Sequence, residues 1–268
     1  MERPIGIFDS GIGGLTVLKE IINAMPGEDT IYLGDTARVP YGTKSAETVT
    51  KYSFENARFL LKFNIKLLVV ACNTASAYCL PQLKKALQIP VVGVIEPGAK
   101  KAVEITKTKR VGVIGTEGTI KSGAYFDAIK SIDSSIAVFT QPCPLFVPLA
   151  EEGWTNNQMA HLTAQTYLND IKKNWIDTLI LGCTHYPLLK EVITEVMGNK
   201  TMLIDSGHET AAEVFRCLAE KNLIKIISSK ESSHRFFVTD SPDRFKQVGS
   251  RFMGASLRNI ELVNLENL

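Results

Sequence analysis

Two cysteines lie where long apolar stretches of this 268-residue chain end. Cys72 follows the run 67–71 and Cys183 follows the run 178–182. Unbroken apolar runs are typical of parallel strands covered on both faces, and ligands of such sheets bind at the carboxyl ends of the strands. A lone free cysteine beside an apolar run is more often a small buried hydrophobic residue than a nucleophile. The second copy at an equivalent position favours chemistry, so we expect the two thiols to act as a pair.

The chain repeats itself around these thiols. Cys72 and Cys183 are 183 − 72 = 111 positions apart, and the similar segments 5–11 and 111–117 are 111 − 5 = 106 positions apart. Nearly equal offsets indicate an internal duplication. Two similar halves that face one another across a cleft would bring one thiol to each side of a bound molecule.

Thiols on opposite sides of a carbon atom suit inversion of its configuration. One thiolate removes a proton from a carbon next to a carboxylate and the opposite thiol returns a proton, so no metal and no redox cofactor is expected. Asp9 can orient and exchange protons with Cys72. His185, two residues beyond Cys183, can serve that thiol in the same way. The alternative for His185 is a packing residue at the start of a helix.

The segment after Cys72 is expected to form a helix over residues 75–87. Asn73, Thr74 and Ser76 are candidate N-caps, because their side-chain oxygens can accept from the free backbone N–H groups of the first turn. The partial positive charge of a helix N-terminus favours thiolate, so this placement would activate Cys72.

The elements that must position these side chains alternate between strand and helix. Strands are expected at 5–8, 30–33, 67–71, 91–95, 111–115, 136–140, 178–182 and 202–204, and helices at 15–24, 45–62, 75–87, 122–129, 157–173 and 188–196. This alternation predicts an α/β fold of two similar domains, each a mainly parallel sheet flanked by helices. In a flavodoxin-like strand order the first and third strands are neighbours, which would place Asp9 and Ser10 beside Cys72. By the same argument, Thr116 would lie beside Cys183.

Several loops and a tail interrupt the alternation. Residues 9–14 imitate the glycine fingerprint of a dinucleotide site, but Thr16 replaces its third glycine and Asp9 stands where a pyrophosphate would lie. The polar loop 34–42 could cover a ligand. The proline-rich loop 141–148 cannot be a central strand, and it leads to Glu151 at the surface or in a cleft. Residues 96–98 are expected to cross between domains. Thr43 or Ser45 is expected to cap the helix at 45–62. The tail from residue 208 should contain a helix to about 220, a polar turn at 228–233, a strand at 235–238, a helix at 243–252 and a last strand.

The composition predicts a soluble protein of the cytoplasm. Thirty Lys and Arg against 28 Asp and Glu leave a net charge of +2, with the basic residues scattered, so no nucleic-acid partner is expected. Five cysteines without a C-x-x-C pair, and no signal sequence, indicate reduced thiols. No apolar run approaches the roughly 20 residues needed to cross a bilayer, so no membrane partner is expected.

Four separated motifs, in this order, resemble the glutamate racemase family of the cofactor-independent aspartate/glutamate racemase superfamily. They are Asp9-Ser10-Gly11-Ile12-Gly13-Gly14, Pro40-Tyr41-Gly42, Ala71-Cys72-Asn73-Thr74-Ala75 and Gly182-Cys183-Thr184-His185-Tyr186-Pro187. The resemblance spans essentially the whole chain. It implies a cofactor-independent isomerase that interconverts L- and D-glutamate and supplies D-glutamate for bacterial peptidoglycan.

The resemblance also implies roles for single residues. Cys72 and Cys183 match the two acid/base residues, with Cys183 acting on the L enantiomer and Cys72 on the D enantiomer. Asp9, Glu151 and His185 match assisting residues. Substrate contacts fall on Ser10, Pro40, Tyr41, Gly42, Asn73, Thr74, Thr116, Thr119 and Thr184. The resemblance implies that the first domain is discontinuous, residues 1–97 plus 208–268, and that residues 98–207 are inserted as the second domain. Members of the family commonly form homodimers.

Three alternatives remain open. A racemase of the same superfamily could act on aspartate or a related amino acid. Cys72, Cys183, His185 and Asp9 are acceptable zinc ligands, although structural zinc sites usually draw on close local pairs that this chain lacks. A binding module that holds an amino acid without changing it would use the same cleft.

Overall fold

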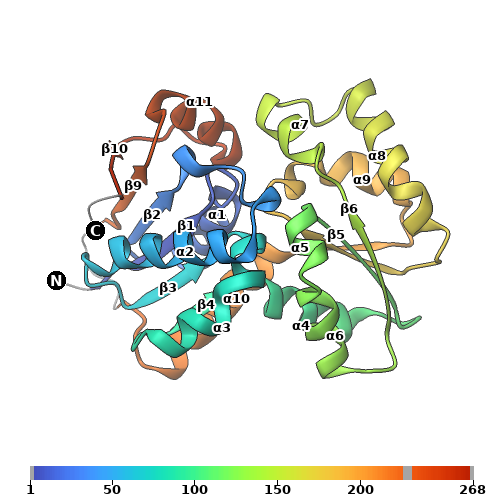
Figure 1. The fold of residues 1–268 in the computed structure, drawn as a ribbon, viewed down its shortest axis with the longest axis horizontal. Coiled ribbons are helices and arrows are strands. Elements are labelled where there is room, and N and C mark those ends of the chain that lie inside the picture. Colours follow the sequence, from blue (N-terminus) through green and yellow to red (C-terminus); the bar gives the residue numbers. More distant parts are fainter. Residues whose placement is uncertain (1–2, 226–230, 266–268) are drawn as a thin grey trace.

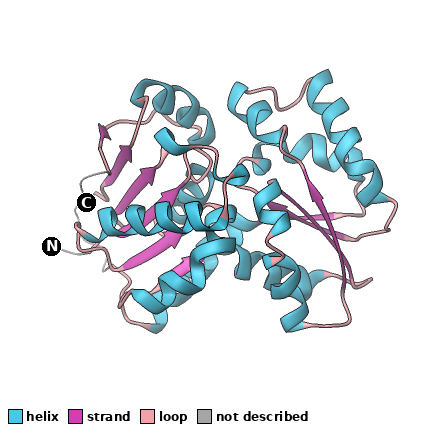
Figure 2. Ribbon diagram, in the orientation of Figure 1, coloured by secondary structure: helices cyan, strands magenta, loops and turns pink. Residues whose placement is uncertain are grey.

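The computed structural model describes residues 3–225 and 231–265, which form two lobes side by side (Figure 1). Each lobe is a parallel sheet with helices packed against it, as the colouring by secondary structure makes plain (Figure 2). The blue and red ends of the chain share one lobe, and the green and yellow middle forms the other (Figure 1). This is the α/β architecture of two similar units that the alternating pattern predicts.

Among the described residues, six strands form the first sheet, in the order β10-β9-β2-β1-β3-β4, and four form the second, in the order β6-β5-β7-β8. All neighbouring strands run parallel. The first sheet contains β1 (Ile5–Asp9), β2 (Thr30–Gly34), β3 (Leu67–Val70), β4 (Val91–Gly93), β9 (His234–Val238) and β10 (Ile260–Leu262). The second contains β5 (Arg110–Gly115), β6 (Ala137–Pro142), β7 (Thr178–Gly182) and β8 (Met202–Asp205).

The helices follow the strands that they cover. Those of the first lobe are α1 (Leu15–Ala24), α2 (Ala46–Leu61), α3 (Asn73–Ala86) and α11 (Pro242–Met253), with short 3-10 turns η1 (Thr36–Arg38) and η2 (Tyr41–Thr43). Those of the second are α5 (Glu117–Lys121), α6 (Ala124–Ile132), α7 (Phe146–Glu152), α8 (Gln158–Lys172), η3 (Tyr186–Leu189) and α9 (Lys190–Met197). The helix predicted at 15–24 has those bounds, and Ser45 caps α2 by accepting from the Thr48 backbone N–H at 3.2 Å.

The two sheets repeat one topology. The order β2-β1-β3-β4 in the first lobe corresponds to β6-β5-β7-β8 in the second, so β1 and β5 play the same part, as do β3 and β7. Every residue of β3 and β7 is buried, which accounts for their unbroken apolar sequences. The predicted internal duplication is therefore visible in the strand order, and Cys72 and Cys183 both follow the third strand of their unit.

Two helices connect the lobes. Helix α4 (Ile95–Ile105) leads out of the first lobe and α10 (Ser206–Glu220) leads back, and they pack against each other. The sequence predicts a crossing between domains at 96–98, and these residues form the first turn of α4, the helix that leads out of the first lobe. A proline is tolerated there, since the N–H groups of a first turn have no partner within the helix.

The proline-rich segment also differs from the prediction. Residues 141 and 142 extend the edge strand β6, where a missing N–H is tolerated, and Phe146 begins helix α7. The predicted helix at 122–129 corresponds to α6, which begins after Gly123 at φ +73°. The short helix α5 before it was not predicted. In the tail, the predicted helix to 220, the strand and the helix near 243–252 correspond to α10, β9 and α11. The predicted turn at 228–233 lies partly outside the described residues.

Candidate active site

A cavity of about 210 Å³ opens where the two lobes meet, and both thiols line it. Its lining includes these predicted site residues: Ser10, Pro40, Tyr41, Gly42, Cys72, Asn73, Thr74, Thr116, Glu151, Cys183, Thr184 and His185. Asp9 and Thr119 are buried behind this lining, each at 1% exposure. The cavity lies below the range of about 300–1,000 Å³ that drug-sized ligands occupy, so it suits a small metabolite better than a dinucleotide. A larger hollow of about 770 Å³ beside Arg38, Lys51 and Leu262 has no cysteine or histidine in its lining.

Cys72 is the N-cap of helix α3. Its sulfur accepts from the backbone N–H of Ala75 at 3.5 Å, and the thiol lies 3.6 Å from the Ser10 hydroxyl. The prediction that Asn73, Thr74 or Ser76 caps this helix is wrong, because the helix begins at Asn73 and not at residue 75. The cysteine itself occupies the capping position.

The surroundings of Cys72 favour its protonated form. Burial and the charge of Asp9 raise the pKa of Cys72 to about 12, and they outweigh the Ala75 amide, which lowers it. The predicted activation by the helix N-terminus is therefore overridden, because desolvation of a thiolate exceeds the stabilisation that one helix end provides.

Asp9 is the last residue of β1, which lies next to β3 as predicted. Burial raises the pKa of its carboxyl group, against the charge of His185 and the backbone N–H groups of Gly14, Gly11 and Ser10, which lower it. Its Oδ2 accepts from the backbone N–H of Gly11 at 2.9 Å, whereas its buried Oδ1 has no hydrogen-bond partner among the described residues. A buried oxygen without a partner can accept a proton or a donor that arrives with a ligand.

Cys183 has a cationic neighbour instead. Its sulfur lies 3.8 Å from Nδ1 of His185, and Nε2 of His185 lies 3.1 Å from Oε1 of Glu151. Glu151 also accepts from Arg244 at 3.2 Å, and Arg244 belongs to helix α11 of the other lobe. A relay of hydrogen-bonded groups thus runs from the surface to the second thiol.

His185 is charged in this setting. Burial lowers the pKa of His185, but its hydrogen bonds to Cys183 and Glu151 outweigh burial and raise the pKa to about 10. The hydrogen bond from His185 in turn lowers the pKa of Glu151. An imidazolium has two N–H donors, one for the sulfur and one for the carboxylate. The ring also contacts Phe252 edge-on, with centroids 5.5 Å apart, so His185 has a packing role as well.

Three threonines join the lobes at the cavity wall. The Thr74 hydroxyl lies 2.9 Å from that of Thr116 and 3.2 Å from that of Thr119. Thr116 also caps α5 by accepting from the Thr119 backbone N–H at 3.2 Å. Thr116 lines the same cavity as Cys183, and its hydroxyl hydrogen bonds with those of Thr74 and Thr119.

Two glycines allow this close approach. A Cβ at Gly13 would lie 2.2 Å from the Thr184 hydroxyl oxygen and 2.5 Å from Nδ1 of His185. A Cβ at Gly42 would lie 2.8 Å from Cβ of Thr116. Because each pair joins one lobe to the other, these glycines serve the fit between lobes. This gives the glycine-rich segment 9–14 a role that needs no nucleotide.

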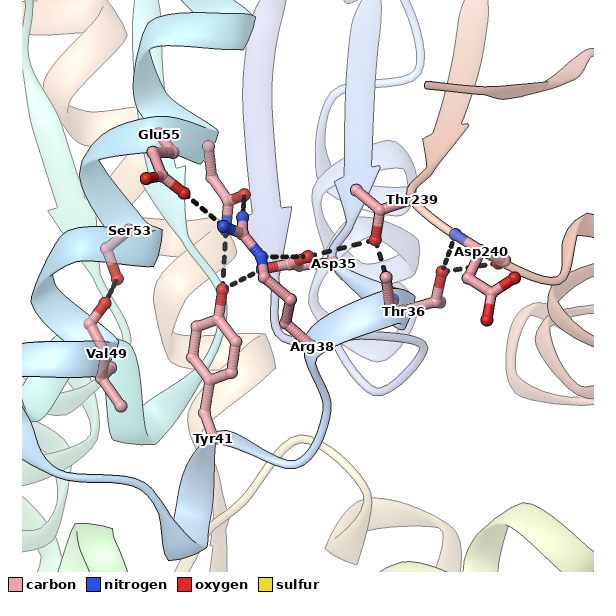
Figure 3. Close-up of polar contacts among 11 residues, drawn as sticks. Asp35, Thr36, Arg38, Tyr41, Val49, Ser53, Glu55, Thr239 and Asp240 are labelled. Atoms are coloured by element: carbon pink, nitrogen blue, oxygen red, sulfur yellow. Dashed lines mark hydrogen bonds and ion pairs between the residues drawn. The ribbon is translucent and has the colours of Figure 1, made fainter. Parts of the chain in front are cut away.

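Tyr41 directs its hydroxyl into a buried polar network (Figure 3). The hydroxyl donates to the Asp35 carboxylate and accepts from Asn56 at 3.1 Å. Asp35 also accepts from Arg38 at 2.8 Å and from the Thr239 hydroxyl at 3.1 Å. Since Tyr41 is only 1% exposed and its hydroxyl is engaged in this network, its side chain is not free to bind a ligand. The network anchors the loop that carries the Pro40-Tyr41-Gly42 motif.

Sequence reasoning missed an apolar wall of the cavity. Pro144, Val147 and Pro148 line it together with Glu151. Val147, Pro148 and Glu151 follow Pro144 by three, four and seven residues, which is the spacing of one helix face. The sequence therefore contains a signal for this wall. The contact between Arg244 and Glu151 could not be predicted, because the two residues are 93 positions apart and lie in different lobes.

The described residues contain neither a metal-binding cluster nor a membrane-spanning helix. Within 3–225 and 231–265, no three His, Cys, Asp or Glu side chains are arranged to hold a metal ion. No helix in that part of the chain is both long and apolar enough to span a membrane. All five cysteines are free.

The chain is similar to proteins of known activity. A sequence profile of Asp/Glu/hydantoin racemases matches residues 5–214. The glutamate racemase of Geobacter metallireducens is 60% identical over 264 residues, which cover 98% of this chain and 97% of that protein. The crystal structure of a glutamate racemase isoform from Bacillus anthracis has a TM-score of 0.93 and 41% identity, covering 98% of each chain. A glutamate racemase from Francisella tularensis, solved in complex with D-glutamate, has a TM-score of 0.93 and 40% identity, covering 100% of this chain and 99% of that one.

Proposed function

The chain belongs to the Asp/Glu/hydantoin racemase family, and on that premise we propose that it interconverts L- and D-glutamate. The observation that supports this most directly is that Cys72 of one lobe and Cys183 of the other line a single cavity of about 210 Å³. An α carbon bound between them has one thiol on each face. Glutamate is favoured over aspartate because the relative at 60% identity is named a glutamate racemase.

In the L-to-D direction the Cys183 thiolate takes the α proton. An S–H bond forms, the C–H bond breaks, and its electron pair is delocalised into the α carboxylate. The His185 imidazolium, 3.8 Å away, stabilises the thiolate before the transfer. Cys72, kept protonated by burial, then delivers its proton to the opposite face of the carbon and is left as the thiolate. In the D-to-L direction the two thiols exchange roles.

Each turnover leaves the enzyme in the opposite protonation state. After an L-to-D turnover Cys72 is a thiolate and Cys183 is a thiol, so protons must be exchanged before the next L substrate reacts. Asp9 and Ser10 beside Cys72 can return its proton. His185, once its imidazolium has lost a proton to solvent, can take the proton from Cys183 and so restore the imidazolium beside the thiolate. Glu151 keeps the imidazole of His185 oriented for this exchange.

Substrate binding is assigned to polar groups at the ends of the strands. Carboxylate oxygens accept hydrogen bonds from hydroxyl, amide and backbone N–H donors. The assigned contacts are Ser10, Pro40, Tyr41, Gly42, Asn73, Thr74, Thr116, Thr119 and Thr184. Asn73, Thr74 and Thr184 are the contributors we assign to the distal carboxylate. Tyr41 contributes its backbone, since its side chain is engaged elsewhere.

The proposal extends to the organisation of the protein. We assign residues 1–97 with 208–268 to the first domain and 98–207 to the second, which is supported by the strands that each sheet contains. A homodimer, a cytoplasmic location and delivery of D-glutamate to bacterial peptidoglycan are what membership of the family implies. Sedimentation of the purified protein tests the dimer.

Polarimetry without added cofactor tests the activity. With the purified enzyme, the rotation of an L-glutamate solution should decay to zero, because the equilibrium constant of a racemisation is unity, while that of L-aspartate should change little. Saturable binding of glutamate without loss of rotation would instead indicate a binding module. Stoichiometric zinc in the protein, with activity lost to a chelator, would overturn the metal-free mechanism.

A further inference from the structure

We propose that Tyr125 is a positioning residue, which fixes the side-chain amide of Asn73 so that its NH₂ group donates to a substrate carboxylate. This inference rests on the proposed glutamate racemase function. Tyr125 belongs to helix α6 of the second lobe, and Asn73 is the first residue of α3 in the first lobe. The Tyr125 hydroxyl donates to Oδ1 of Asn73 at 2.8 Å, so the hydrogen bond crosses between the lobes.

The other end of the Asn73 amide points to a ligand. Asn73 lines the cavity and is 2% exposed, and its Nδ2 has no hydrogen-bond partner among the described residues. A buried N–H donor without a partner is unfavourable, and proteins rarely keep one without a use. A carboxylate oxygen that enters the cavity would satisfy this donor. The structure therefore contains a donor that substrate can complete.

The Tyr125 hydroxyl decides which end of the amide faces the cavity. A side-chain amide has an acceptor oxygen at one end and a donor nitrogen at the other, and its terminal torsion is broad and roughly two-fold. With Oδ1 held by Tyr125, the nitrogen remains for the ligand. Without that hydroxyl the amide can flip and turn its oxygen toward a carboxylate, which repels it. The Tyr125 hydroxyl thus determines whether the Asn73 amide attracts or repels a substrate carboxylate.

Tyr125 is itself held firmly where the two connecting helices meet. It is 2% exposed, and a Cβ at Gly182 of β7 would lie only 3.0 Å from its ring. A Cβ at Gly98 of α4 would lie 3.6 Å from its hydroxyl. Ser206, at the start of α10, lies on the same side of Gly98 as the Tyr125 hydroxyl. Because α4 and α10 join the lobes, Tyr125 links their arrangement to the orientation of a binding group.

Replacement of Tyr125 by phenylalanine tests the role, because it keeps the ring and removes the hydroxyl. We expect Tyr125→Phe to raise KM for both glutamate enantiomers about tenfold and to leave kcat within about twofold, the pattern of lost uniform binding. Asn73→Ala should raise KM in the same way. The double variant should be no worse than Asn73→Ala alone, because Tyr125 acts through that amide. Racemisation by the wild-type enzyme, measured alongside, tests the proposed function separately.

Two further variants keep the test decisive. Tyr167→Phe removes another hydroxyl of the second lobe, one that accepts from the Leu145 backbone N–H at 3.2 Å, and it should leave KM unchanged. Asn73→Asp keeps an acceptor for Tyr125 and replaces the NH₂ donor by an acceptor. We expect it to raise KM by more than about 100-fold with a Tm near that of the wild type.

Three results would overturn the inference. These are an unchanged KM in folded Tyr125→Phe, additive effects in the double variant, and an Asn73→Asp enzyme that binds glutamate as the wild type does. If Tyr125→Phe does not fold, the Asn73→Asp result decides. In an enzyme that racemises glutamate, any of these outcomes rejects the role of Tyr125 and leaves the proposed function intact.

Discussion

Cys72 and Cys183 occupy equivalent positions in two copies of one topology, yet their neighbours carry opposite charge. Beside Cys72 lies the buried carboxyl group of Asp9, which helps to raise the pKa of that thiol to about 12. Beside Cys183 lies His185, with a pKa raised to about 10. The duplicated scaffold thus supplies symmetry of position, and single side chains supply a different charge beside each thiol.

The two thiols also differ in whether their hydrogen-bonded groups stay within one lobe. Cys72 caps helix α3, and its hydrogen-bond partners, Ser10 and Ala75, belong to its own lobe. Cys183 precedes the 3-10 turn η3, and its partner His185 continues through Glu151 to the other lobe. The Cys183 half therefore depends on contacts between lobes, and the Cys72 half depends on burial.

Loss of either thiol should have the largest effect. We expect Cys72→Ala and Cys183→Ala each to lower kcat/KM by at least about 10³-fold in both directions, because the acid of one direction is the base of the other. Cys217→Ala, at a half-buried cysteine of α10 outside the cavity, is the control and should retain activity. Circular dichroism of each enantiomer measures the rates. Substantial racemisation by either single variant would show that one thiol suffices.

A half-reaction separates the two thiols. Elimination of HCl from 3-chloroglutamate requires removal of the α proton by one thiolate and departure of chloride from the β carbon, with no proton returned. We expect Cys72→Ala to retain elimination from the L enantiomer and Cys183→Ala to retain it from the D enantiomer. Chloride release measures both. The reverse pattern would contradict the assignment of the thiols to the two enantiomers.

Much of this site follows from the sequence, for reasons that particular residues make clear. The buried runs before Cys72 and Cys183 fix two strand ends, and parallel topology then brings Asp9 to the first thiol. The raised pKa of Cys72 could not be predicted, because its desolvation depends on packing from distant segments. Contacts between lobes, such as Arg244 with Glu151, join positions that no local pattern relates.

Removal of the charged group beside either thiol, His185 or Asp9, should have the next largest effect on kcat/KM. We expect His185→Asn and Asp9→Asn each to lower kcat/KM about 10²-fold. Because the equilibrium constant is unity, the loss in kcat/KM must be equal in both directions, so direction is resolved by the elimination reaction. His185→Asn should slow elimination from the L enantiomer more, and Asp9→Asn from the D enantiomer. If both variants slowed elimination from the two enantiomers equally, the proposed difference between the two thiols would be wrong.

The ion pair between His185 and Glu151 should make stability depend on pH. The raised pKa of His185 stabilises the fold fully below its ordinary value of 6.5 and loses this effect as pH rises through about 10. The lowered pKa of Glu151 stabilises above its ordinary value of 4.5 and loses the effect as pH falls. Glu151→Gln should therefore cost about 1.5 kcal/mol of stability between about pH 4.5 and 6.5, and progressively less toward pH 10.

Thermal unfolding of the two proteins across this range measures the difference. A Tm difference that does not change between pH 6 and about pH 10 would show that the ion pair does not contribute in this way.

The smallest effect is expected for a substrate contact. Thr184→Val keeps the shape of the side chain and removes a hydroxyl at the cavity wall, so KM should rise about threefold to tenfold with kcat little changed. Thr166→Val, in α8 outside the cavity, is the matched control. Steady-state kinetics on both enantiomers measures KM. Unchanged kinetics for Thr184→Val would remove Thr184 from the binding site.

Incorporation of solvent deuterium tests the two-thiol mechanism most directly. With one base on each face, the proton taken by one thiolate is not the proton that the other thiol delivers. At early conversion of L-glutamate in deuterium oxide, D-glutamate should carry deuterium at the α carbon, and recovered L-glutamate should remain protiated by NMR. Equal early deuterium in product and recovered substrate would mean that a single base serves both faces, which contradicts the mechanism.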